Sequence, residues 1–158
     1  MKNQNVIFSL IMVIFLTTFS CGIVSIEEKA PGITFSESFP PDLTSFNTIL
    51  TNGSNRTWNV TGFSFGESTN FQNCRLDDSL ILKNDGTYDY NGGNELCGAE
   101  DNSQFKTGIW EADFDSRTIY FDKGTGNEIE IFIESCQESK VVFSSKYFGM
   151  KVLGQFES

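Results

Sequence analysis

Short, evenly spaced runs of β-prone residues leave this chain few folds to adopt. From Arg56 onward, Phe, Tyr, Ile, Val and Thr gather in runs that Gly, Asn and Asp separate at intervals of about ten residues. Such spacing is typical of all-β proteins, and no segment of the chain shows convincing helical periodicity. We predict strands over residues 57–65, 78–83, 87–91, 105–112, 118–122, 128–134, 140–147 and 150–157.

The segments between these runs indicate hairpins. Asn84-Asp85-Gly86 lies between two β-prone runs, and Asp-Gly favours the positive φ of a tight turn. Sequential hairpins without a long crossover favour an up-and-down meander, and eight strands are about enough to close a small barrel without exposed edges. We therefore expect an all-β fold, an eight-stranded antiparallel up-and-down barrel, with bulges at Gly62 and Gly108.

One face of each strand is expected to form the core. In the run from Glu128 to Glu134, Ile129, Ile131 and Ile133 share one face, while the other face is mostly acidic. The same alternation in the other runs predicts the rest of the inward set: Trp58, Val60, Leu80, Leu82, Tyr88, Tyr90, Trp110, Val141, Phe143, Val152 and Phe156.

The N-terminal residues have the layout of an export signal. Lys2 precedes an apolar core from Val6 to Leu16, and small polar residues then lead to Ser20 and Cys21. The apolar core is too short to span a bilayer, which takes about 20 apolar residues. A cysteine directly after the small residue resembles a bacterial lipoprotein signal, so we expect a signal peptide over 1–20 and a lipid on Cys21. The alternative is a plain secretory signal and a secreted protein.

Composition divides the rest of the chain into two parts. Residues 21–55 are rich in Ser, Thr, Pro and Glu and show no periodicity, which predicts a tether with a short ordered piece at Leu43–Leu50 packing on the domain. Residues 56–158 are then the barrel. The tether would hold this domain at a membrane face, without spanning it.

Charge and the lack of histidine exclude several classes of function. The net charge of −10 opposes binding to nucleic acid or to anionic lipid headgroups. No histidine is present, so Ser-His-Asp triads and His-based zinc sites are impossible. Paired carboxylates could still hydrolyse glycosides, but Asp85 and Asp113 fall in turns and Glu111 on an outward position. We expect a protein that is not an enzyme and holds no metal or cofactor.

One ordered combination of motifs carries a resemblance over about Leu50 to the C-terminus. The motifs are Arg56-Thr-Trp58-Asn-Val-Thr, Cys74 with Asp77-Asp78, Asp85-Gly-Thr-Tyr88, Cys97 and Thr107-Gly-Ile-Trp110. With these motifs the chain resembles the lipocalin-like domain of Bacteroidetes lipoproteins, which implies a lipocalin-like barrel in the cell envelope, at the outer membrane of a Gram-negative bacterium.

Cys74 and Cys97 are expected to form a disulfide. They flank the Asp-Gly hairpin in a chain bound for an oxidising compartment, and the resemblance favours the same pair. Cys136 is left over in the predicted turn 134–138, either partly buried or as a free thiol near the surface, without a histidine to activate it.

The predicted function is binding without catalysis. The chain contains 16 Phe, which core packing or an aromatic cavity would explain. We expect a small apolar or amphipathic ligand in the barrel interior or mouth. The alternative is a barrel filled by side chains that acts as a protein-protein interaction or inhibitor module in the envelope. A void of about 300 Å³ distinguishes the two. The candidate ligand-binding residues are Trp58, Phe63, Tyr88, Tyr90, Trp110 and Phe143.

Overall fold

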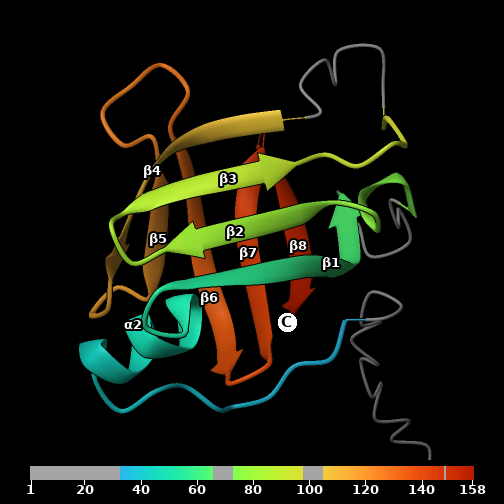
Figure 1. Cartoon of the computed structure of the whole chain (residues 1–158). Coiled ribbons are helices and arrows are strands. Elements are labelled where there is room, and N and C mark those ends of the chain that lie inside the picture. The colour runs from blue at the N-terminus through green and yellow to red at the C-terminus, as the bar shows by residue number, and fades with distance from the viewer. Residues whose placement is uncertain (1–32, 66–72, 98–104, 148) are drawn as a thin grey trace, which may run out of the picture.

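Eight antiparallel strands form one closed barrel, and each strand pairs with its neighbours in chain order (Figure 1). The computed structural model describes residues 33–65, 73–97, 105–147 and 149–158. The closed barrel with strands paired in chain order confirms the predicted eight-stranded up-and-down barrel. The strands are β1 (Asn55–Phe65), β2 (Ser79–Lys83), β3 (Thr87–Asn91), β4 (Phe105–Asp113), β5 (Thr118–Phe121), β6 (Ile129–Gln137), β7 (Lys140–Tyr147) and β8 (Met150–Glu157).

A helix, α2 (Leu43–Thr51), closes one end of the barrel (Figure 1). Asp42 caps its N-terminus by accepting a 2.7 Å hydrogen bond from the backbone N–H of Ser45. Phe46 and Leu50 are 0% and 1% exposed because they pack against the barrel core. The ordered piece expected at Leu43–Leu50 is confirmed, whereas its helical form was not predicted, because nine residues are too few to show a clear period.

The segment before α2 packs along the outside of the barrel. Ile33 is 2% exposed and contacts Val142 and Leu153 on the outer face of β7 and β8. The backbone N–H of Thr34 donates to Gln155 Oε1 at 3.0 Å, and that of Cys136 donates to the carbonyl oxygen of Ser38 at 2.9 Å. We call residues 33–41 the strap. The prediction of a tether up to residue 55 is therefore wrong for residues 33–55, which belong to the folded domain.

Most of the predicted inward set is buried in one core, but Ile129 is 44% exposed because it lies at the very start of β6, at the rim. The bulge expected at Gly62 is confirmed by a register shift between Val60 and Gly62. Gly108, in contrast, pairs regularly with Tyr88 and is not a bulge. It is glycine for another reason, since a Cβ there would lie 2.1 Å from Asp122 Oδ1.

Candidate functional site

The half of the barrel next to α2 is filled by its own side chains. A cavity of about 10 Å³ remains there, which is about the space of one water molecule. Small-molecule sites usually measure roughly 300 Å³ or more. The cavity is lined by residues of α2 and of six strands: Leu50, Trp58, Leu80, Leu82, Ile119, Phe121, Ile131, Ile133, Val141 and Phe156.

The six candidate ligand-binding side chains all belong to this core or pack against it. Trp58, Tyr88 and Phe143 are at most 6% exposed, while Phe63, Tyr90 and Trp110 are partly buried. The indole Nε1 of Trp110 donates to the carbonyl oxygen of Lys83 at 3.0 Å. The Phe143 ring stacks on Phe156 with centroids 4.9 Å apart. These contacts give the aromatic groups a structural role, and their role in ligand binding stays a prediction.

Tyr88 joins β3 to the end of β5. Its hydroxyl donates to Asp122 Oδ2 at 2.9 Å, while Asp122 Oδ1 accepts from the backbone N–H of Ile109 at 3.1 Å. The carboxylate lies directly over Gly108, which has no side chain to displace it. Burial, with the hydrogen bond to Asp122, raises the pKa of the Tyr88 phenol to about 12.

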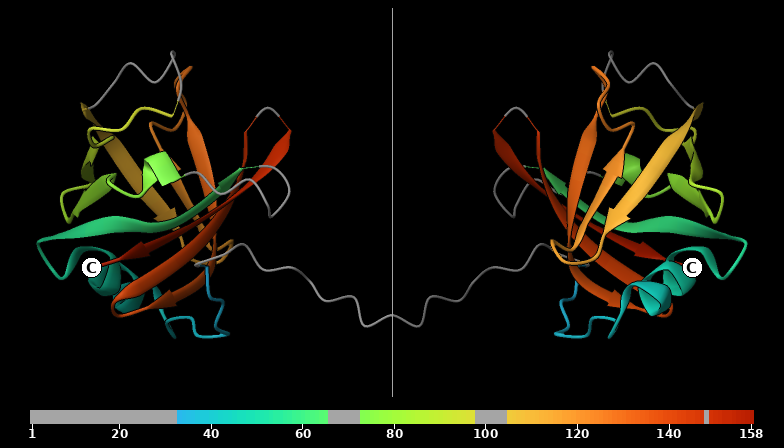
Figure 2. Two further views of the ribbon diagram at one scale, coloured as in Figure 1. Left: turned by 90° about the vertical axis from the view of Figure 1, so that its right-hand side faces the viewer. Right: turned by 90° about the vertical axis from the view of Figure 1, so that its left-hand side faces the viewer.

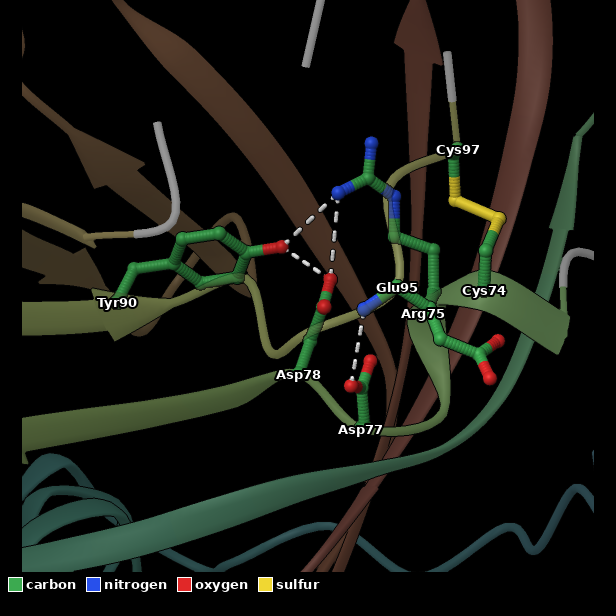
Figure 3. The surroundings of a disulfide bond; sticks show 7 residues. All are labelled: Cys74, Arg75, Asp77, Asp78, Tyr90, Glu95 and Cys97. Carbon is green, nitrogen blue, oxygen red and sulfur yellow. Dashed lines mark hydrogen bonds and ion pairs between the residues drawn. A yellow bond between two sulfur atoms is a disulfide. The ribbon is translucent and has the colours of Figure 1, made fainter. Parts of the chain in front are cut away.

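A disulfide between Cys74 and Cys97 anchors a polar corner of the barrel, as predicted (Figure 3). Cys74 lies in a short 3₁₀ helix, η1 (Asn73–Arg75). The Asp77 carboxylate accepts from the backbone N–H groups of Asn94 and Glu95 at 2.6 and 3.2 Å, and these bonds lower its pKa. The disulfide and Asp77 together hold the segment after β3 against the segment before β2.

Asp78 is a buried carboxylate in the same corner. Its side chain is 1% exposed, and Oδ2 accepts from the Tyr90 hydroxyl and, at 3.3 Å, from Arg75 Nη1 (Figure 3). Oδ1 has no hydrogen-bond partner among the described residues. Burial raises the pKa of Asp78 and also that of Tyr90. Because Val60 N donates to the carbonyl oxygen of Asp78, the β1–β2 pairing continues to this residue.

Cys136 is fully buried, which corrects its predicted place in a turn. Strand β6 continues to Gln137, and a register shift between Ile133 and Ser135 turns Cys136 into the core, where it is 1% exposed. Burial raises the pKa of its thiol to about 12. A thiol in this environment is a packing group, because the reactive species is the thiolate.

Two surface regions carry large apolar side chains that the sequence analysis did not single out. On the outer face of β4, Phe105 and Ile109 are 62% and 58% exposed. At the far end of the β7–β8 hairpin, Tyr147 and Met150 are 57% and 43% exposed. The alternation of residues along β4 could have identified the first of these regions from the sequence, because Phe105 and Ile109 share a face with Glu111 and not with Trp110.

The carboxylates considered for catalysis are mostly engaged elsewhere. Asp85 lies in a turn, as predicted, and Asp113 is the last residue of β4; each accepts a hydrogen bond from the backbone N–H of the residue two positions later. Asp89, a further acid on β3, forms an ion pair with Lys83 at 2.8 Å. Within the described ranges, no group of three or more His, Cys, Asp and Glu side chains has the arrangement of a metal site. The helix in those ranges is also too short to cross a membrane.

Comparison of the chain with protein-family models, with curated proteins and with solved structures found no match. The lipocalin-like resemblance therefore rests on the motifs in the chain, and the closed up-and-down barrel is the class of fold that the structure defines.

Proposed function

We propose that this protein is a non-catalytic interaction module of the cell envelope, attached to a membrane by a lipid on Cys21. The packing of the barrel carries the proposal. Next to α2, the described inward side chains leave a cavity of about 10 Å³, where a small-molecule site needs roughly 300 Å³. A barrel filled in this way contacts other molecules through its surface. The up-and-down topology also supports the lipocalin-like kinship that we include in the proposal.

The outer face of β4 is the surface that best suits a protein partner. Phe105 and Ile109 are two of the most exposed large apolar side chains among the described residues. Their neighbours on this face include Glu111, which forms an ion pair with Lys123. An apolar centre with charged surroundings is the usual composition of a protein-protein interface.

Photo-crosslinking in the source cells tests this surface. A photoreactive residue placed at 105 or at 109 should give discrete protein adducts. The matched control is position 57, because Thr57 is exposed on the outer face of β1. Adducts at none of the three positions, or the same adducts at all three, would argue against β4 as the contact surface.

Native mass spectrometry of protein purified from its own envelope tests the rest of the proposal. A stoichiometric small molecule on the protein would favour the ligand-binding hypothesis over the filled barrel.

The intact mass of the denatured chain tests the anchor. We expect a chain that begins at Cys21 and carries acyl groups, and an unmodified N-terminus would place the protein among secreted proteins instead.

A further inference from the structure

The β7–β8 hairpin projects from the barrel at its open end. In both views of Figure 2 its far end lies apart from β4, β5 and β6, beside the end of β1. The pairing of β6 with β7 reaches only from Gln137 to Phe132, whereas β7 and β8 stay paired as far as Tyr147 and Met150. The turn passes through Gly149, whose φ is +79°. We call residues 146–147 and 149–151 the hairpin tip.

The two faces of the hairpin tip differ in character. Tyr147 and Met150 lie opposite each other on one face, both exposed, and the Tyr147 ring contacts Phe65 with centroids 5.9 Å apart. Lys146 and Lys151 lie opposite each other on the other face, and both are exposed. One face of the tip is therefore apolar and contains an aromatic ring, and the other face carries a pair of positive charges.

No anion in the described part of the protein neutralises the two opposed lysines. Like charges directly opposite each other destabilise a sheet. Lys83, Lys123 and Lys140 each have a carboxylate partner, whereas Lys106, Lys146 and Lys151 have no ion pair in the described part of the chain. Of these three, Lys146 and Lys151 lie directly opposite each other. Because the chain has a net charge of −10, acids are plentiful, and yet no described acid pairs with either lysine.

Ile33, the first residue that the structure describes, lies against this same hairpin. Ile33 packs on Val142 of β7 and Leu153 of β8, and Leu153 is only three residues along β8 from Met150. Residues 21–32 could span at most about 40 Å if fully extended. A lipid on Cys21 and the hairpin tip can therefore reach the same bilayer, whereas β4 lies on the opposite side of the ring of strands from β8.

We propose that the hairpin tip docks on an anionic lipid surface. Tyr147 and Met150 enter the interface between headgroups and acyl chains, where aromatic side chains are favoured, and Lys146 and Lys151 bind lipid phosphates. The contact is local, since the molecule as a whole is acidic. It would leave the outer face of β4 directed away from the membrane. The inference relies on the proposed lipid anchor only for the proximity of the membrane.

Hydrogen exchange in the presence of vesicles tests the docking. The protein as purified from its envelope is mixed with vesicles of neutral phosphatidylcholine, or of phosphatidylcholine with phosphatidylglycerol. Exchange at the hairpin tip should slow with the anionic vesicles only, while the β2–β3 hairpin is unaffected. The variants Lys146→Ser/Lys151→Ser and Tyr147→Ser/Met150→Ser should lose this protection. Loss of each lysine should weaken vesicle binding about fivefold.

Matched controls distinguish docking of the hairpin tip from a general effect of charge. The variant Lys106→Ser/Lys123→Ser removes the same charge from other places and should keep the protection. Equal exchange with both vesicle types, or equal loss in the control variant, would overturn the proposal. Protection that grows with protein concentration without vesicles would also overturn it, because a second copy would then cover the tip. If the intact mass shows no lipid, the anchor fails, and the vesicle comparison still decides the docking.

Discussion

The indole Nε1 of Trp58 donates a 2.9 Å hydrogen bond to the carbonyl oxygen of Leu50, and so connects the wall of the barrel to the last turn of α2. The Arg56 guanidinium lies over the Trp58 ring, and its Nη1 donates to the carbonyl oxygen of Ile49 at 2.8 Å. Helix α2 is therefore an integral part of the core, although it precedes every strand in the chain.

Replacing Leu50 by alanine should destabilise the whole barrel. Leu50 is 1% exposed and lines the small central cavity, so its truncation enlarges that cavity. We expect a loss of about 2–5 kcal/mol in the free energy of unfolding, measured by urea denaturation. The control is Leu43→Ala in the same helix, because Leu43 is 46% exposed. A similar small effect for both variants would mean that α2 does not contribute to the core.

Removing the disulfide should cost about 3 kcal/mol in the free energy of unfolding, because the bond closes a loop with a sequence separation of 23 residues. The variant Cys74→Ser/Cys97→Ser and the reduced wild-type protein should show the same loss by chemical denaturation. A reducing agent should not destabilise the variant further. A reduced wild-type protein as stable as the oxidised form would contradict the expected contribution.

Alanine at position 108 should destabilise the protein because the new methyl group has no space. It would lie 2.1 Å from Asp122 Oδ1 and 2.6 Å from Tyr88 Cε1. Overpacking of this kind costs about 1–3 kcal/mol, which thermal unfolding would reveal. Gly126→Ala is the matched control, since no described atom lies within 4 Å of a Cβ at that position. Equal melting temperatures for the two variants would refute the close approach of Asp122.

Tyr88 should make stability fall at alkaline pH. Its pKa rises from 10.0 to about 12 on folding, so its contribution is fully present below about pH 10 and is lost as the pH rises toward 12. Tyr88→Phe should lower stability by about 1 kcal/mol near neutral pH and flatten the alkaline decline. Denaturant unfolding at several pH values measures both effects. An unchanged alkaline slope in the variant would show that another group causes it, and Tyr120→Phe serves as the outer-face control.

Much of the fold followed from local patterns. Strands β3, β7 and β8 have the predicted bounds, and the Asp85-Gly86 turn joins β2 to β3. Alternation and turn chemistry depend on neighbouring residues, which is why one sequence suffices for them. The pairing of Cys74 with Cys97 was also predictable, because both residues flank a hairpin whose ends had to meet.

The candidate sites were less predictable. The sequence identified Trp58 and Tyr88 as aromatic, yet whether they surround a cavity or fill it depends on how α2 packs under them. Cys136 was expected in a turn, because the register shift after Ile133 leaves no mark in the residue pattern. The exposed pair Lys146 and Lys151 becomes visible only when the register of β7 and β8 is known.

The amino-acid sequence by itself determined the class of fold, the number of strands and the disulfide, because these depend on local β propensity, turns and spacing. The tertiary structure decided which surfaces are covered. Ile33 covers Val142 on the outer face of β7, and Phe46 and Leu50 close the barrel, although they come from a segment with no recognisable pattern. Burial is set by contacts between segments far apart in the chain, and such contacts exist only after the barrel has closed.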